Sequence, residues 1–142
     1  MPTRYAHINI IAHDWRKLCE FYEQVFDCKP YSSERNHHGK HIDELTRMQG
    51  VRVQGRHLSV PGHGENGPTI EIFTFSDNGE DSPRPLNRPG FAHIAFEVDN
   101  LSDFPCPPNE IKCHRDGSFF YYQEIPDGTV IEWLYWDTPQ KL

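Results

Sequence analysis

Two stretches of the chain have the apolar, β-branched pattern of a strand, and each carries a histidine near its beginning. They are "YAHINIIAHD" at residues 5–14 and "FAHIAFEVDN" at residues 91–100, with His7 and His93 each following an alanine and preceding an isoleucine. Successive side chains of a strand point to opposite faces, so His7 shares a face with Asn9. The isoleucine between them points to the other face, where it can pack on a helix.

The residues after the first stretch predict an amphipathic helix. The apolar positions of "DWRKLCEFYEQVF" recur at three- and four-residue steps: Leu18, Phe21 or Tyr22, and Val25 or Phe26. Asp14 is expected to cap this helix, because its side-chain oxygen can accept a hydrogen bond from a free amide of the first turn. Pro30 is expected to stop it, since proline has no amide hydrogen to donate.

The rest of the chain predicts two further groups of strands with a loop between them. After a polar segment, in which a short helix is expected near "HIDELTRM", strand patterns resume at "VRVQGRHLSV" and "TIEIFTF". The loop-forming "SDNGEDSPRPLNRPG" follows. The order then restarts with strands at "FAHIAFEVDN", "SFFYYQEI" and "TVIEWLYW". The turn residues "PGHGENG" and "PDG" are expected to connect neighbouring strands.

This restart predicts a single domain over residues 1–142 that contains two modules. Module 1 covers about residues 1–78, a joint covers residues 79–88, and module 2 covers about residues 89–142. Each module has a histidine early on its first strand and a glutamate on its last strand. The repeat is weak in sequence, but it matches in element order as well as in residue type.

The two glutamates are Glu71 and Glu132, and each shares a strand face with large apolar residues. A carboxylate in such a place is costly unless something compensates its charge. Taken singly, each of these glutamates and histidines is typical of an ordinary sheet residue. Taken together, His7, Glu71, His93 and Glu132 make a donor set of two nitrogens and two oxygens, which suits one divalent ion of Zn, Ni, Co, Mn or Fe.

At these residues the chain resembles the vicinal oxygen chelate superfamily, which includes glyoxalase I, methylmalonyl-CoA epimerase, extradiol dioxygenases and bleomycin- or fosfomycin-resistance proteins. The resemblance lies in "HINIIAHDWRKLCEFYEQVF", "GPTIEIF", "RPGFAHIAFEVDN" and "PDGTVIEW". It implies an α+β fold of two βαβββ modules that form a cupped, barrel-like mixed sheet around a metal ion. The family's ligand positions fall on His7, Glu71, His93 and Glu132. Dimerisation is common in the family, so we expect a homodimer, with the four ligands from one chain or from both.

An H-E-H-E ligand set looks most like the bacterial type of glyoxalase I. The resemblance then implies a lactoylglutathione lyase-type isomerisation of a small-molecule substrate, by proton transfer through a metal-bound enediolate. Glu132 is the first choice for the catalytic base, and Glu71 is a ligand that can share this role. One alternative is an Fe(II) extradiol-type dioxygenase, in which Glu71 is dispensable. Another is a non-catalytic small-molecule-binding dimer of the bleomycin-resistance type, which binds no metal.

Two segments depart from the family pattern. In the second module, "LSDFPCPPNEIKCHRDG" has three prolines and poor helical periodicity, so we expect its helix to be short or missing. In the first module, "NHHGKHIDELTRMQGVRVQGRH" lacks an assignable glutathione-contacting pattern, which leaves the substrate open. Its histidines His37, His38 and His41 form either a lid over the site or a solvated surface loop.

Charge and composition narrow the partners and the compartment. The net charge of −7 argues against a nucleic-acid partner, because phosphate binding needs a basic face. No apolar run is long enough to span a membrane, and the first residues lack the apolar segment of a signal peptide, so we predict a cytoplasmic protein. The four cysteines show no C-x-x-C spacing and are expected to be reduced and structural.

Overall fold

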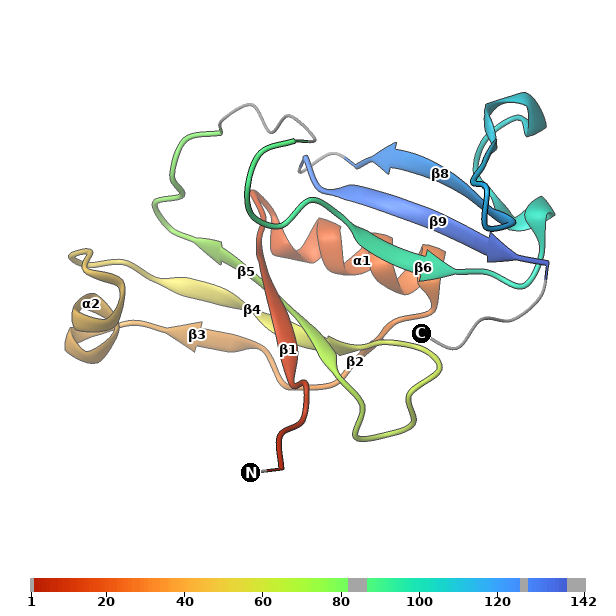
Figure 1. Cartoon of the computed structure of the whole chain (residues 1–142). Coiled ribbons are helices and arrows are strands. Elements are labelled where there is room, and N and C mark those ends of the chain that lie inside the picture. The colour runs from red at the N-terminus through yellow and green to blue at the C-terminus, as the bar shows by residue number, and fades with distance from the viewer. Residues whose placement is uncertain (1, 82–86, 126–127, 138–142) are drawn as a thin grey trace. The chain divides into compact units, whose positions relative to one another are not determined.

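The chain divides into two compact units, Met1–Asp81 and Ser82–Leu142. The computed structural model describes residues 2–81, 87–125 and 128–137 (Figure 1). The division falls inside the segment in which the sequence predicts a joint. Residues 82–86 of that joint, and the first two residues of the predicted "PDG" turn, lie outside the described part of the chain. Each unit has its own mixed sheet and is described by itself.

The first unit is a mixed sheet with one long helix. Its elements in chain order are β1 (His7–Ile11), α1 (Trp15–Phe26), β2 (Lys29–Pro30), β3 (Arg35–His37), α2 (Lys40–Thr46), β4 (Val53–Ser59) and β5 (Thr69–Phe75). The strand order is β1-β5-β4-β2, and β3 also pairs with β4. β1 runs parallel to β5, whereas β4 is antiparallel to β5, β2 and β3. The strand and hairpin predictions for this module are confirmed.

Helix α1 begins and packs as its apolar period predicts. The Asp14 carboxylate accepts hydrogen bonds from the amides of Arg16 and Lys17, which confirms the predicted cap. The helix packs against β4 and β5. Its buried residues are Trp15, Leu18, Cys19, Tyr22 and Phe26. Val25, one of the two expected positions in the last turn, is exposed instead.

The end of α1 differs from the prediction. The helix stops at Phe26, where Asp27 adopts a left-handed conformation with φ of 55°, and the Cys28 amide donates to the Tyr22 carbonyl at 3.2 Å. The chain has therefore left the helix before it reaches Pro30, which lies in β2. The stop comes from a left-handed cap of the kind that satisfies the last carbonyls of a helix.

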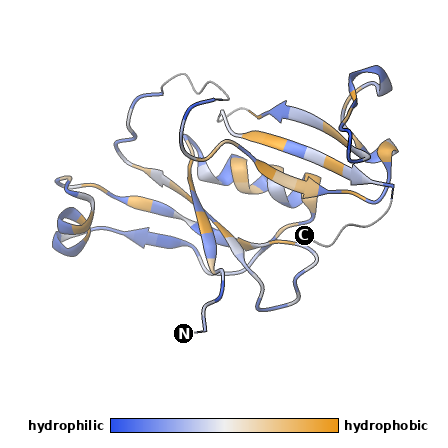
Figure 2. Ribbon diagram, viewed as in Figure 1, coloured by the Kyte–Doolittle hydropathy of each residue, from blue (hydrophilic) through white to orange (hydrophobic). Residues whose placement is uncertain are grey.

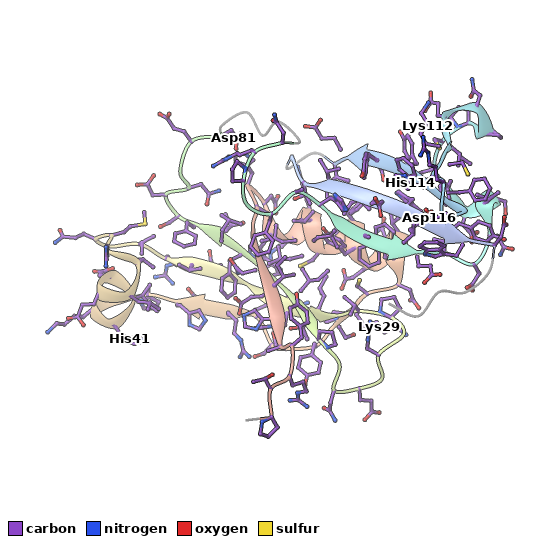
Figure 3. The ribbon with its side chains drawn as sticks, viewed as in Figure 1. Lys29, His41, Asp81, Lys112, His114 and Asp116 are labelled. Atoms are coloured by element: carbon purple, nitrogen blue, oxygen red, sulfur yellow. The ribbon has the colours of Figure 1, made fainter. Side chains whose placement is uncertain are left out.

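The polar segment between α1 and β4 holds more structure than the sequence predicts. Strands β2 and β3 form in it, because both pair with the edge of β4. Helix α2 confirms the short helix expected there, and it has no buried residue. Figure 2 shows α2 as mainly hydrophilic. The three histidines are not one loop, since His37 belongs to β3 and His41 to α2, where Figure 3 labels it.

The second unit repeats the strand order with a reduced helical part. Its elements are β6 (Ile94–Glu97), the 3₁₀ turns η1 (Leu101–Asp103) and η2 (Pro108–Glu110), β7 (Lys112–Cys113), β8 (Ser118–Glu124) and β9 (Val130–Trp136). The sheet order is β6-β9-β8-β7, with β6 parallel to β9. Two 3₁₀ turns stand where the first unit has α1, which confirms that the second-module helix is reduced. Proline cannot donate to a helical ladder, and this segment contains three.

Candidate functional site

His7 and Glu71 lie close together in the first unit. The parallel pairing of β1 with β5 sets Asn9 opposite Glu71, and His7 is two residues earlier on the same face as Asn9. The imidazole Nε2 is 3.7 Å from Glu71 Oε1, which is too long for a hydrogen bond. The Glu71 side chain is only 17% exposed, so its charge lies in a largely desolvated place.

A second histidine, His57, contacts Glu71 more closely than His7 does. It lies on β4 directly opposite Glu71 on β5. Its Nε2 is 2.7 Å from Glu71 Oε2, and its Nδ1 is 2.9 Å from the Thr69 hydroxyl. Its ring meets the His7 ring edge-on, with 5.2 Å between the centroids. We name His7, His57 and Glu71 the first half-site.

The surroundings of His57 determine its charge and which of its ring nitrogens carries the hydrogen. Burial lowers the pKa of His57, and the charges of His7 and Arg35 act in the same direction, against the raising effect of Glu71. The ring is therefore neutral near pH 7. A carboxylate only accepts hydrogen bonds, so Nε2 carries the hydrogen and donates it to Glu71. Nδ1 then accepts from the Thr69 hydroxyl, and this second contact fixes the ring orientation.

Asn9 completes the shell around Glu71. Its Nδ2 donates to Glu71 Oε1 at 3.0 Å and lies 3.3 Å from the Glu71 carbonyl oxygen. Both carboxylate oxygens thus accept a hydrogen bond, one from Asn9 and one from His57. These two hydrogen bonds orient the carboxylate, whose Oε1 is also 3.7 Å from His7 Nε2.

The second unit contains a matching group, which we name the second half-site: His93, Tyr122 and Glu132. His93 lies one residue before β6 rather than on the strand, and its Nε2 is 3.7 Å from Glu132 Oε2. Tyr122 lies on β8 opposite Glu132 on β9, and its ring is 5.3 Å from that of His93. Burial, followed by the charge of Glu132, raises the pKa of Tyr122, so its hydroxyl stays protonated and hydrogen-bonds the carboxylate.

The strand registers make the two half-sites equivalent. Glu132 is opposite Ala95 in the parallel pair, as Glu71 is opposite Asn9, and each histidine precedes that residue by two positions. In the antiparallel pairs, Tyr122 takes the position of His57. The backbone of each unit therefore places one imidazole at the same distance from one carboxylate.

Each half-site fits two ligands of a divalent ion. Nitrogen and oxygen donors that bind one tetrahedral ion at about 2.0–2.2 Å are about 3.5 Å apart, close to the observed 3.7 Å. Within residues 2–81, 87–125 and 128–137, no group of three or more histidine, cysteine, aspartate or glutamate side chains is arranged to hold a metal. The structure thus brings together His7 with Glu71, and His93 with Glu132. The four-ligand set stays a prediction.

A pocket of about 290 Å³ opens at the first half-site. His7, His57 and Thr69 line it from the sheet, and the chain before β1 and the turns before β3 and β5 supply the remaining walls. A volume near 300 Å³ is at the small end of the range for ligand pockets. The arrangement can therefore hold a small molecule beside the His7 imidazole.

Sequence reasoning assigned no role to His57, Tyr122 or Asn9. Strand alternation could have identified Asn9, because it places Asn9 on the same strand face as His7. His57 and Tyr122 are found only through the register of the hairpins β4–β5 and β8–β9. Their connections differ in length, so residue pattern alone does not align the strands across them.

Comparisons with known proteins identify the family and the fold. A sequence model described as "Glyoxalase/Bleomycin resistance protein/Dioxygenase superfamily" matches residues 4–104. No curated protein sequence matches the chain significantly.

Several solved structures have a similar fold. A glyoxalase family protein from Bacillus cereus has a TM-score of 0.74 at 13% identity, covering 95% of each chain. A glyoxalase/bleomycin resistance protein/dioxygenase domain from Frankia sp. EAN1pec has a TM-score of 0.60 at 16% identity, covering 95% of this chain and 98% of its own. A protein from the mobile metagenome of V. Pseudocholerae has a TM-score of 0.54 at 19% identity, with coverages of 97% and 98%. The predicted glyoxalase-like fold is confirmed.

Among the described helices, none has the length and apolar character needed to cross a membrane.

Proposed function

The chain belongs to the glyoxalase/bleomycin resistance protein/dioxygenase superfamily, and from this premise we propose that it is a metal-dependent isomerase of the vicinal oxygen chelate type. Its substrate is a small α-hydroxycarbonyl compound or thiol adduct, and the reaction is a glyoxalase-I-like proton transfer. The observation that carries the proposal is the repeated pair of an imidazole and a carboxylate, 3.7 Å apart at the same register in both units.

The proposed metal is one divalent ion per chain, with two donors from each half-site. His7 and Glu71 supply one pair, and His93 and Glu132 supply the other. When bound, such an ion supplies Lewis acidity that favours loss of a proton next to a substrate carbonyl. A strongly desolvated carboxylate on an apolar strand is explained by such a charge, since its burial is otherwise costly.

Glu132 is proposed as the base that removes and returns the proton. Both oxygens of Glu71 accept hydrogen bonds, from Asn9 and from the neutral His57, so this carboxylate is held mainly as a ligand. Glu132 has one described hydrogen-bonding side chain, the Tyr122 hydroxyl. The Tyr122 hydroxyl orients Glu132, and the proposal assigns this carboxylate the transfer of the substrate proton.

The dioxygenase alternative is less well supported by the first half-site. It treats Glu71 as dispensable, but two side chains hold that carboxylate in place. The non-catalytic alternative binds no metal, and it supplies no cation to compensate the two largely desolvated carboxylates.

Metal analysis of the purified chain, after loading with Zn, Ni, Co, Mn or Fe(II), tests the proposal. We expect one ion per chain, and reduced metal content in Glu71→Gln and Glu132→Gln. Glu124→Gln is the matched control, because Glu124 is exposed on β8 and outside both half-sites. Reconstituted protein is then screened for solvent-deuterium incorporation into α-hydroxycarbonyl compounds. Absence of metal, together with unchanged metal content in both variants, contradicts the proposal.

Assembly is proposed from family membership alone. We expect a homodimer, and light scattering coupled to gel filtration measures its mass directly. A monomer at micromolar concentration contradicts this part and leaves the metal proposal standing.

A further inference from the structure

The pocket at the first half-site has a marked excess of positive charge. Arg4 and Arg35 line it together with His7 and His57. No carboxylate lines it. The chain as a whole carries a net charge of −7, so two arginines in one small pocket stand against the overall balance. The pocket therefore has an electrostatic character of its own.

Neither arginine has a carboxylate partner among the described residues. Elsewhere in the first unit, Arg16 and Arg56 lie within 4 Å of Glu34, at 2.8 Å and 3.7 Å. Among the described residues, the one side-chain hydrogen bond of the Arg35 guanidinium is a long one, 3.5 Å from Nη1 to the Ser33 hydroxyl. Over the described part of the chain, no ion pair involves Arg4. Their donors are available to a ligand.

From this charge and shape we infer that the pocket binds an oxyanion on the substrate, held by the guanidinium groups of Arg4 and Arg35. The planar fork of a guanidinium matches two oxygens of a carboxylate or phosphate. Asn66 adds an amide to the same pocket wall. The substrate is thus an anionic small molecule, with its charged group in the pocket and its reacting carbon toward His7.

Two tyrosines indicate what the anion is attached to. Tyr5 and Tyr31 line the pocket, and they are 63% and 52% exposed. Exposed aromatic side chains at the edge of a charged pocket offer apolar surface to the body of a ligand. The ligand class is therefore an oxyanion with a small apolar or planar body, in a volume of about 290 Å³.

This inference rests on the proposed function for the chemistry that follows binding, but anion binding itself needs no metal. The two therefore fail separately. A chain that binds no metal and still binds the anion through its arginines overturns the isomerase and keeps the anion pocket. A chain that binds one metal ion but shows no arginine-dependent anion binding overturns the anion pocket and keeps the isomerase.

Calorimetric titration of the full chain with benzoate, phenyl phosphate and benzamide tests the pocket. These probes share a planar ring and differ in the charged group, and each is used before and after metal loading. The variants are Arg4→Gln and Arg35→Gln. Arg115→Gln is the matched control, because it removes the same charge from an exposed position in the second unit. Circular dichroism checks that each variant folds.

We expect at least one of the two anions to bind, and each pocket variant to weaken it about tenfold or more. The Arg115→Gln control should bind like the natural chain. Binding of benzoate alone assigns a carboxylate, and binding of phenyl phosphate alone assigns a phosphate. The inference is overturned if neither anion binds, if benzamide binds equally well, or if the pocket variants match the control.

Discussion

The two half-sites have the same backbone register but different side chains around the carboxylate. In the first, Glu71 is held by Asn9 and a neutral His57. In the second, Ala95 takes the place of Asn9, and Tyr122 takes that of His57. Ala95 has no donor to offer. The repeated strand framework thus preserves the distance from imidazole to carboxylate, while different residues around it give the two carboxylates different hydrogen-bond partners.

The surroundings of the half-sites differ as well. The first half-site opens on a pocket with two arginines. The second unit has its labelled charged residues, Lys112, His114 and Asp116, around β7 and the turn that follows it (Figure 3). This difference fits the proposal that the first unit recognises the substrate and that Glu132 of the second unit is the base.

The largest expected difference between the half-sites is in turnover. Glu132→Gln should lower turnover per bound metal about 10²–10⁴-fold, because an amide cannot accept the substrate proton. Glu71→Gln should lower it less, because the amide oxygen can still act as a ligand. Deuterium incorporation into the substrate, divided by metal content, measures both. A larger loss in Glu71→Gln would assign the base to Glu71, and equal losses would contradict the assignment of Glu132 as the single base.

A second comparison concerns stability at matched strand positions. Gly55 on β4 lies opposite Phe73, and Phe120 on β8 is its counterpart, opposite Leu134. A Cβ at Gly55 would overlap the Ile72 carbonyl oxygen. Gly55→Ala should therefore lower the free energy of unfolding by about 3 kcal/mol, at the upper end of overpacking effects.

Chemical denaturation of Gly55→Ala measures this loss. Gly79→Ala is its control, because no atom lies within 4 Å of the added Cβ. At the counterpart position a large side chain is already present, and it stacks on His114 at 4.1 Å. Chemical denaturation of Phe120→Ala measures the stability contribution of this counterpart position. Unchanged stability in Gly55→Ala would mean that β4 and β5 move apart at this position.

A third comparison removes the residues that hold the carboxylates. His57→Gln should weaken metal affinity about 10–100-fold, the range for hydrogen-bond partners of metal ligands. Tyr122→Phe should weaken it less, since it removes one hydrogen bond and keeps the ring. Competition with a fluorescent chelator measures both affinities. A larger effect of Tyr122→Phe would contradict the assignment of Glu71 as the more tightly oriented ligand.

A fourth comparison uses the helix caps. Asp14→Ala should lower the free energy of unfolding by about 1 kcal/mol, because it removes the carboxylate that accepts from two amides of α1. Asn100 occupies the cap position of η1 but makes no capping hydrogen bond with its side chain. Asn100→Ala should therefore change stability very little. Thermal unfolding of both variants checks the pair, and equal losses would show that the cap in the first unit is not stabilising.

The smallest expected effect separates the cysteines. Burial raises the pKa of Cys19 and Cys28 from 9.0 to about 12, whereas Cys113 in the second unit is exposed. Iodoacetamide at pH 8 should modify Cys113 and leave Cys19 and Cys28 unmodified, because the thiolate is the reacting form. Peptide mass spectrometry gives the sites. Modification of Cys19 in folded protein would contradict its burial.

The same pKa values define an alkaline stability effect. A thiol with a raised pKa in the folded chain stays protonated up to about pH 12, whereas in the unfolded chain it loses its proton above pH 9. Stability from this source is complete below pH 9 and is lost as the pH rises toward 12. The midpoint of chemical denaturation should therefore fall as the pH is raised from 8 to 10.5. In Cys19→Ala this midpoint should fall less steeply with pH.

Local pattern was sufficient for most elements of the fold. The period of α1, its cap at Asp14, and the apolar runs of β4, β5, β8 and β9 all follow from spacing and side-chain chemistry. It failed for β2 and β3, which are polar and form only because β4 offers an edge to pair with. Local pattern also placed the end of α1 at Pro30, later than observed, because the left-handed conformation of Asp27 has no signature in the apolar spacing.

By itself, the sequence determined that a histidine and a glutamate recur in each half of the chain, on strands where such groups need compensation. The alternation of strand faces and the repeat of element order were enough for that. Only the tertiary structure decided that His57 and Tyr122 lie against those glutamates, and that two arginines share a pocket with His7. Residues that contact across strands depend on pairing register, which hairpin geometry sets and which single-strand patterns do not contain.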